Sequence, residues 1–433
     1  MPLSSLRPLR SRNFALVWSS ALVSNVGSWM QTVALGTLVT LQTHNAFWTA
    51  LTLAAGFIPM GILAPIGGVL ADRLDRRRWL IVTTLAEAAF AACLAALVAS
   101  GLTSPGILVL LSFLGGSAGA IGFPSYQSML PDLVERDDLL AAVSLSSAQW
   151  NMGRVIGPAL AGVVLVVWSP AAAFSINAAS FFAVVLALGF VRLPPHVRSQ
   201  TREGIVSRLR AGARAALDEP GCRAAIALIS VVALLGSPFI GLVAAMAIDG
   251  LHRRAGGPAV LTTAQGIGAV LGALALAPMA RRFGQQRVVT VAVTAFSVAL
   301  IFYGLSSTLP LAAVAIFFVG GTYIWVLSGL NTVVQLRAPE AARGRILSLY
   351  MMALGTIYPI GLIIQGAIAQ HIGVRTMTVL SGVLVLGVVA ALLALRPAMF
   401  RALSTTTGPG EPALDVTVPE VAEVDLGRAD ASD

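Results

Sequence analysis

The feature that most constrains this chain is a succession of apolar stretches, each long enough to cross a lipid bilayer. A helix rises about 1.5 Å per residue, so a hydrocarbon core of about 30 Å takes roughly 20 apolar residues. With 57% hydrophobic and 11% charged residues, the chain could not fold in water without exposing large apolar surfaces. We therefore predict an all-α membrane protein with twelve transmembrane helices. They cover residues 14–36, 47–71, 79–99, 105–129, 139–166, 171–191, 223–248, 259–280, 286–305, 310–334, 344–369 and 375–396.

The distribution of arginine indicates the orientation of the chain. With the amino terminus inside the cell, only Arg253, Arg254 and Arg375 lie outside, and Arg154 lies within a helix. All other arginines are then cytoplasmic, as the positive-inside rule requires. Lysine is absent, which we interpret as the composition bias of a GC-rich bacterial genome. We predict a multi-pass protein of the bacterial cytoplasmic (inner) membrane with both termini in the cytoplasm. The arginine-rich connections cover residues 72–78, 131–138, 192–222, 281–287 and 335–345.

An internal repeat divides the chain into two halves. Paired glycines and paired arginines recur at an offset of about 205 to 209 residues. Two parallel six-helix halves around a midplane cavity are the architecture of many secondary transporters. We therefore predict pseudosymmetric six-helix bundles at residues 1–191 and 223–396. The matched residues are Gly115 with Gly320, Gly116 with Gly321, Arg73 with Arg282 and Arg78 with Arg287.

The segments outside the bundles have a different composition. In the cytoplasmic linker at 192–222, apolar residues recur every fourth position, which predicts a short amphipathic helix on the inner leaflet. An ordinary linker is the alternative. The tail at 397–433 is rich in Thr, Pro, Glu and Asp, and we predict that it is disordered. The apolar positions in the linker are Ile205, Leu209, Ala213 and Leu217.

Residues 67–78 combine glycines, an acidic residue at a helix end and a basic cluster. This segment resembles the signature of the major facilitator superfamily between its second and third helices, with Asp75 where that family usually has glycine. The resemblance implies that Asp72 engages the positive amino end of the eleventh helix and latches the cytoplasmic gate. For the arginines, the alternative is a role in topology alone. The candidate gating residues are Gly68, Asp72, Arg73, Arg76, Arg77, Arg343 and Arg345.

The fifth predicted helix carries small residues around a proline, which permit a close approach of helices and a local bend. It resembles the fifth-helix motif associated with exporters in the same superfamily, with Ala161 in place of one terminal glycine. The resemblance favours export over import. The candidate packing residues are Gly153, Gly157, Pro158 and Gly162.

Two ionisable residues lie at depth within apolar spans. Arg154 costs roughly 2.5 to 3.5 kcal/mol at the midplane on insertion scales, so it must face a polar cavity or a partner. The functional interpretation is that Arg154 binds an anionic substrate or modulates a protonatable partner. The alternative is a structural pair with carbonyl groups or with Asn151. Glu87 is the leading candidate for proton coupling, and a neutral structural glutamate is the alternative. Residues 114–129 lack the fourth-helix arginine that is another proton-linked signature of the superfamily.

Polar and aromatic residues gather at depth in several other helices. Hydrogen-bonding groups among apolar walls suit a cavity for an amphipathic or aromatic compound. The same residues could instead bridge helices, and Trp29 could be an interfacial anchor. The candidate cavity residues, besides Arg154, are Asn25, Trp29, Gln31, Tyr126, Gln127, Gln149, Asn151, Asn331, Gln335, Tyr350 and Tyr358.

Four stretches, at residues 22–31, 72–78, 151–162 and 343–350, resemble the enterobactin-exporter-like branch of the superfamily, also known as transmembrane secretion effectors. This resemblance implies export of siderophore-like or drug-like molecules by alternating access, with proton antiport. An importer, or a receptor or scaffold that does not transport, remains the alternative.

The expected partners are a small-molecule substrate, the proton and the lipid bilayer, and a monomer suffices for this architecture. We expect no enzyme activity, because the histidines are scattered and no nucleotide-binding loop or metal-ligand spacing is present. No cofactor or metal is expected. Nucleic acid is not an expected partner, since the arginines lie in short clusters between apolar spans.

Overall fold

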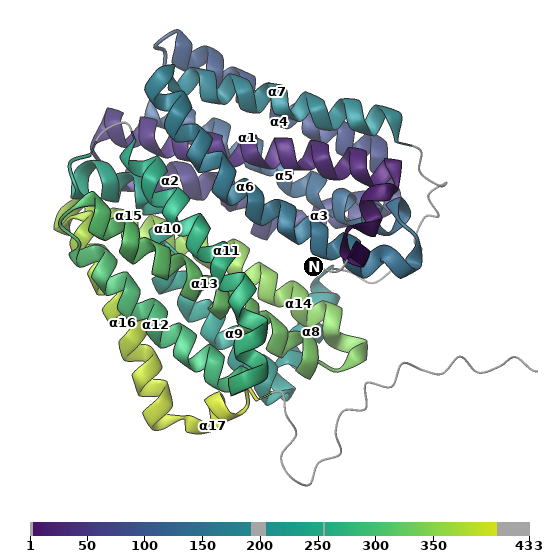
Figure 1. Ribbon diagram of the computed structural model, residues 1–433, viewed down its shortest axis with the longest axis vertical. Helices are drawn as coiled ribbons and strands as arrows, with labels where there is room; N and C mark the ends of the chain where they lie inside the picture. Colours follow the sequence, from purple (N-terminus) through teal and green to yellow (C-terminus); the bar gives the residue numbers. More distant parts are fainter. Residues whose placement is uncertain (1–2, 192–204, 254–255, 405–433) are drawn as a thin grey trace, which may run out of the picture.

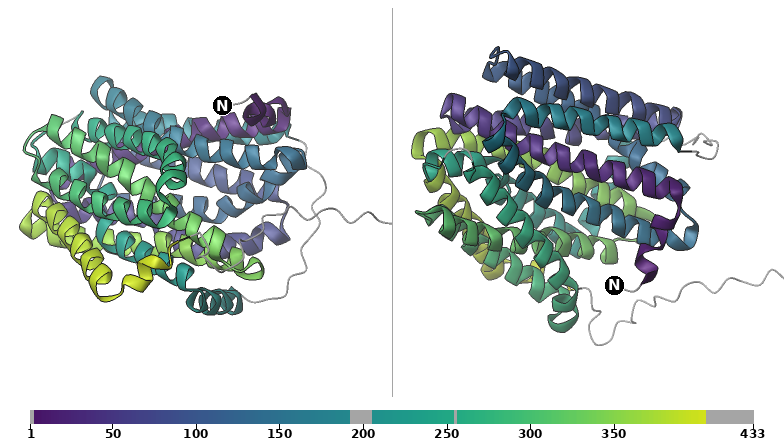
Figure 2. Two further views of the ribbon diagram at one scale, coloured as in Figure 1. Left: turned by 60° about the horizontal axis from the view of Figure 1, so that its bottom comes forward. Right: turned by 45° about the horizontal axis from the view of Figure 1, so that its top comes forward.

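The computed structural model describes residues 3–191, 205–253 and 256–404, which form helices and short connections without any strand. Figure 1 shows two groups of helices, one from the first half of the chain (purple to blue) and one from the second (green to yellow). Figure 2 shows the same division from two other directions. The predicted all-α class is confirmed.

The first half contains six spans. The second span is divided into α2 and α3, which follow each other directly at Phe57 and Pro59. The helices are α1 (Arg12–Thr43), α2 (Ala46–Phe57), α3 (Pro59–Arg73), α4 (Arg76–Ala99), α5 (Pro105–Met129), α6 (Leu139–Val167) and α7 (Pro170–Phe190).

The second half also contains six spans, of which the first and fifth are interrupted by π-helical turns. The elements are α9 (Pro220–Val231), η4 (Val232–Gly236), α10 (Phe239–Ala245), η5 (Met246–Gly250), α11 (Gly257–Phe283), α12 (Gln285–Leu305), α13 (Leu309–Arg337), α14 (Arg343–Met352), η7 (Ala353–Ile357), α15 (Tyr358–Ile372) and α16 (Val374–Leu395). Shorter helices lie outside the spans, namely η1 (Leu3–Arg10), η2 (Leu130–Leu133), η3 (Arg136–Asp138), α8 (Ile205–Asp218), η6 (Glu340–Ala342) and α17 (Pro397–Arg401).

Eleven spans in the described part of the chain are long and apolar enough to cross a membrane. The twelfth, α1, has 32 residues, but Ser, Thr, Asn and Gln along it lower its hydropathy. It packs along α6 and α7 inside the first bundle. Apolar side chains cover the outer surfaces of the bundles, where Val166, Leu186 and Phe302 are 63%, 63% and 61% exposed. Such surfaces belong in lipid.

Helix starts follow local sequence signals. Ser104 and Ser169 each cap the following helix with a side-chain oxygen and precede a proline at its first position. Asp75 accepts a hydrogen bond from the backbone N–H of Arg78 at 2.8 Å and so caps α4. Asp75 thus marks the start of α4.

The repeated glycines occupy matching interfaces in the two bundles. Gly116 packs α5 onto the backbone of Gly56 in α2, and Gly320 packs α13 onto the backbone of Gln265 in α11. A Cβ atom at Gly116 or Gly320 would collide with a carbonyl oxygen. The two halves therefore pack their second and fourth spans in the same way.

The two bundles meet mainly at one end. We call it the histidine end, because His44, His252 and His371 lie there, and we call the other the arginine-rich end. Toward the histidine end α2 packs along α15, α10 contacts α1 and α2, and α6 packs against α11. At the arginine-rich end α3 and α14 make few contacts, and Figure 1 shows the bundles diverging there.

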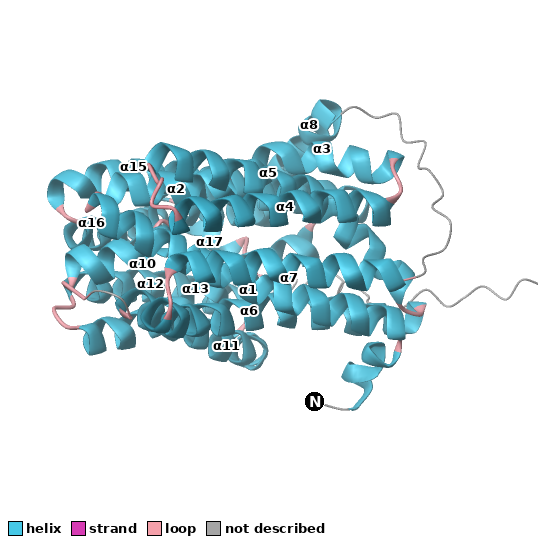
Figure 3. Cartoon of the chain, turned by 90° about the horizontal axis from the view of Figure 1, so that it is seen from above, coloured by secondary structure: helices cyan, strands magenta, loops and turns pink. Residues whose placement is uncertain are grey.

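The linker helix α8 packs against α14 at the arginine-rich end, and Figure 3 shows α8 and the start of the chain at the same end. The face of α8 that packs against the protein includes Gly212, which lies against Arg345, and the buried Ala216. Leu217, from the predicted apolar stripe, is 59% exposed. Ala213 is half-buried, and the side chains of Ile205 and Leu209 lie outside the described ones.

The prediction that the tail is disordered from residue 397 is wrong for its first residues. The tail begins with α17, and Phe400 and Leu403 are 2% and 0% exposed within the core of the second bundle. The backbone oxygen of Ser404 accepts a hydrogen bond from Arg337 at 3.3 Å. Residues 397–404 are mostly apolar, and burial of Phe400 and Leu403 stabilises this first part of the tail. Residues 405–433 lie outside the described residues.

Candidate functional site

A small pocket lies between the two bundles at mid-depth. It has a volume of about 30 Å³, room for about one water molecule. Trp29 of α1 and Phe57 of α2 contribute to it from the first bundle, and Tyr358 of α15 contributes from the second. Phe57 is the last residue of α2 and Tyr358 the first of α15, so the pocket lies where the second and eleventh spans are interrupted.

Arg154 lies beside this pocket on α6. The central carbon of its guanidinium group is 5.2 Å from the ring centroid of Trp29, a cation–π contact. Tyr323 and Tyr358 lie within electrostatic range of Arg154. No carboxylate of the described residues pairs with this arginine, and Asn151 hydrogen-bonds the backbone of Ser147 instead. Arg154 therefore leaves a positive charge at the seam between the bundles.

Tyr358 presents a hydroxyl group without a hydrogen-bond partner at the same place. Its hydroxyl is buried and has no hydrogen-bond partner among the described residues. Its ring packs edge-on against Phe57, with the two centroids 5.6 Å apart. Buried hydroxyl groups are nearly always hydrogen-bonded, so an orphaned one beside a cavity marks a position where a ligand or water can bind.

The small residues of the fifth span set the position of Trp29 and Arg154. Gly153 and Gly157 pack α6 onto Asn25 and Trp29 of α1. Gly162, farther along, faces Ala259 of α11. In α11, Gly266 lies against the backbone oxygen of Arg154. The glycines thus let α6 approach both its own bundle and the opposite one, and they place Trp29 in the middle of the seam rather than at a membrane interface.

Several predicted cavity residues instead connect helices. Gln31 accepts a hydrogen bond from Asn177 at 2.8 Å, and the Tyr126 hydroxyl donates to Gln149 at 3.2 Å. These two contacts connect α1 to α7 and α5 to α6. The residues therefore bridge helices, which was the predicted alternative to lining a cavity. In the second bundle, Tyr350 donates to the backbone oxygen of Leu327, and Gln335 donates to Asn331 within α13. Gln127 is exposed.

Glu87 lies away from the central pocket. Its carboxylate faces Gly119 of α5, where a Cβ atom would come within 2.7 Å of Oε1. Glu87 therefore occupies the interface between α4 and α5, with room provided by a glycine. Glu87 does not line the pocket between the bundles.

The gating segment at the arginine-rich end is tied into its own bundle. Arg76 pairs with Asp132 at 3.3 Å, and Arg77 donates to the backbone oxygen of Gly189 at 2.7 Å. Gly67, not Gly68, is the glycine in close contact, against the backbone of Ile121. Gly68 faces open space, and three arginines of the predicted gate are exposed, namely Arg73, Arg343 and Arg345.

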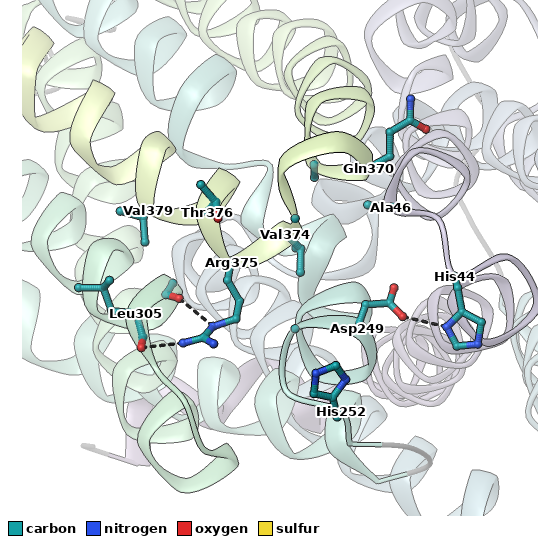
Figure 4. A pocket seen from close by; sticks show the side chains of 14 residues that line it. His44, Ala46, Asp249, His252, Leu305, Gln370, Val374, Arg375, Thr376 and Val379 are labelled. Atoms are coloured by element: carbon teal, nitrogen blue, oxygen red, sulfur yellow. Dashed lines mark hydrogen bonds and ion pairs between the residues drawn. The ribbon is translucent and has the colours of Figure 1, made fainter.

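A hydrogen bond at the histidine end joins the bundles. Nδ1 of His44, at the end of α1, lies 2.9 Å from Oδ1 of Asp249 in η5 (Figure 4). The two residues border a cavity of about 670 Å³ together with His252 and Arg375. They are 205 residues apart, which is the offset of the internal repeat. The two residues were not among the predicted site residues, although the repeat offset was a signal that could have revealed them.

Two six-helix bundles that face each other across a central seam are the arrangement of the major facilitator fold. A bacterial homolog of the human lysosomal transporter Spinster, solved in an inward-facing and unoccupied conformation, superposes with a TM-score of 0.73 at 16% identity. The match covers 93% of this chain and 99% of that structure. It bears on the fold alone.

The chain belongs to the transmembrane secretion effector family, whose model matches residues 3–421. The multidrug efflux pump Tap of Mycolicibacterium fortuitum is 28% identical, over 87% of this chain and 95% of the pump. The enterobactin exporter EntS of Escherichia coli O1:K1 is 27% identical, over 90% of this chain and 93% of the exporter. The predicted family is confirmed. The chain is a multi-pass membrane transporter of small molecules, and its relatives are transporters rather than enzymes.

Proposed function

We propose that the protein exports small organic molecules across the bacterial cytoplasmic membrane by alternating access, with proton antiport. The observation that carries this proposal is the unequal closure of the seam. The bundles are packed together at the histidine end and diverge at the arginine-rich end. If the arginine-rich end faces the cytoplasm, as the positive-inside rule requires, this conformation receives its substrate from inside the cell.

Each end then has its own closing contact. At the histidine end, the pair between His44 and Asp249 holds the outer side shut. Closing the inner side requires α3 and α14 to approach each other. That movement would bring Asp72, in the last turn of α3, toward the positive amino end of α14. The proposed cycle exchanges one contact for the other.

Export is supported by the names of the relatives, which are efflux pumps and exporters, and by the close packing of the fifth span. Glu87 is the proposed proton carrier, because it is the acid within a span and lies beside α5. Protonation there would change the packing of α4 on α5 and reach the seam through α5.

The experiment begins with cells that contain or lack the protein, compared by untargeted mass spectrometry of the medium and the cytoplasm. Compounds that accumulate inside cells lacking the protein are then tested in proteoliposomes. We expect movement that depends on an imposed pH gradient and stops when a protonophore is added. Uptake in the opposite direction would establish an importer. No movement of any compound would favour the receptor or scaffold.

A further inference from the structure

We propose that the seam selects organic anions, in which a carboxylate or similar oxyanion is joined to an aromatic body. This inference rests on the proposed transport function and names the class of substrate. The site that carries it consists of Arg154, Trp29, Tyr358 and Phe57, which we call the seam cluster. In this cluster Trp29 lies on α1, Phe57 on α2, Arg154 on α6 and Tyr358 on α15.

The charge of the seam cluster is the first argument. Arg154 carries only donor groups and has no carboxylate partner among the described residues. Within the described spans, the acids are Glu87, which faces Gly119, and two residues at span ends, Asp72 and Asp249. Asp249 already pairs with His44. A cationic substrate would therefore meet an uncompensated positive charge at low dielectric, whereas an anion would neutralise it.

The orphaned hydroxyl of Tyr358 is the second argument. It is buried without a partner and lies on the same pocket as Trp29. A hydroxyl donates to an oxyanion at little cost, and a charge-assisted hydrogen bond is about twice as strong as a neutral one. One oxyanion between Arg154 and Tyr358 would satisfy both groups at once. Because these residues come from opposite bundles, such a ligand would also link the two halves.

The aromatic walls are the third argument. The Trp29 ring lies under the guanidinium group, and the rings of Phe57 and Tyr358 meet edge-on. A flat apolar body can stack on such surfaces. The pocket itself holds about one water molecule, so the body of the ligand would lie on the side of Arg154 where the bundles diverge.

The test compares three probes of one shape: 2-naphthoate, 2-naphthalenemethanol and 2-naphthylmethylammonium. Binding to the purified full-length protein in nanodiscs is measured by equilibrium dialysis. We expect the anion to bind about tenfold or more tightly than the alcohol, and the cation most weakly. Equal binding of the three probes, or preference for the cation, would overturn the anion inference. Transport of some compound by the same preparation would leave the proposed function standing.

Variants test whether the charge of Arg154, rather than a folding defect, sets the preference among the probes. Arg154→Gln should remove the preference for the anion, and Arg154→Lys should retain part of it. Arg282→Gln is the matched control, because Arg282 lies over Phe283 with a similar ring distance of 5.3 Å outside the seam. It should bind all three probes like the unmodified protein. Tyr358→Phe should lower the affinity for the anion several-fold while the order of the three probes is kept. An unchanged affinity for the anion would show that the hydroxyl group does not contribute to the site.

Discussion

Arg154 is the residue whose position says most about this transporter. A guanidinium group in the middle of a span is tolerated only beside polar or aromatic partners, and here Trp29 is that partner. Its neighbours Gly153 and Gly157 are small, so α1 can come close enough for the contact. The residue that is most costly in lipid thus lies where the two halves of the molecule meet.

A different charged pair supports the second bundle. Glu219 caps α9 by accepting a hydrogen bond from the N–H of Cys222, and it pairs with Arg337 of α13 at 2.8 Å. Burial raises the pKa of Glu219, but the hydrogen bonds from Cys222 and Arg337 outweigh it and hold the pKa below its usual range. A lowered pKa means that the folded state favours the charged carboxylate.

We predict that Glu219→Gln lowers stability at neutral pH by roughly 1 to 2 kcal/mol, since it weakens a cap and removes an ion pair. Because the folded-state pKa is depressed, the contribution of Glu219 is complete above the unfolded value of about 4.3 and fades as pH falls through the folded pKa. Melting temperatures of the two proteins in detergent should differ at pH 7 and converge in acid. A constant difference at all pH values would contradict the ionic role.

At the scale of elements, three of the spans at the seam are interrupted. The second span breaks between α2 and α3, and the seventh and eleventh spans contain π-helical turns. Such breaks let one half of a span move relative to the other, and π turns are frequent at functional sites. The intact spans α12, α13 and α16 pack against one another within the second bundle.

Glycine packing within a bundle should be sensitive to a single methyl group. We predict that Gly320→Ala lowers the melting temperature, because the added Cβ meets the backbone of Gln265 in α11, at a cost of about 1 to 3 kcal/mol. Gly189→Ala in α7 is the control, since nothing lies within 4 Å of its Cβ position. It should melt at the same temperature or slightly higher. Equal losses in both variants would refute the packing argument.

The proposed inner latch is a contact between elements. We predict that Asp72→Asn lowers the rate of transport several-fold while its abundance in the membrane is unchanged, because the amide interacts less strongly with the positive end of α14. Asp137→Asn, an exposed acid in η3 at the same end, should transport normally. Transport rates in proteoliposomes, scaled to protein content, provide the comparison. Equal rates in Asp72→Asn and the unmodified protein would exclude the latch.

At the scale of the whole molecule, the contacts between the bundles lie mainly at the histidine end. The pair between His44 and Asp249 joins positions related by the internal repeat, one from each bundle. Pseudosymmetry places such positions opposite each other across the axis, so complementary charges there can close one end. This arrangement explains why two residues 205 positions apart form a hydrogen bond at the end of the seam.

We predict that Asp249→Asn shifts the population toward a form open at the histidine end. Spin labels at Ser100 and Ser307, one per bundle and both exposed at that end, report the opening in a protein whose two native cysteines have been replaced. Double electron–electron resonance should show longer distances in Asp249→Asn. His252→Ala, which borders the same cavity, should keep the shorter distances. Identical distance distributions in all three proteins would contradict the proposed outer latch.

Much of the fold was predictable because it is determined locally. The predicted spans agree with the observed helices to within a few residues over most of the chain, since bilayer thickness sets their length. Prolines and capping residues at Ser104, Ser169 and Glu219 set the helix starts. The site was less predictable. Trp29, Arg154 and Tyr358 come together as cavity candidates, whereas Gln31 and Tyr350 connect helices.

By itself, the sequence determined the number of spans, the paired halves and the family, because these depend on hydrophobic length, repeated residues and local motifs. Only the tertiary structure decided which polar side chains face the seam, which end is closed and that the tail begins with a helix. The physical reason is that lipid and protein core are both apolar, so a hydrophobic span carries little information about which face turns inward. That choice is made by packing, as in the approach of α6 to α1 and α11.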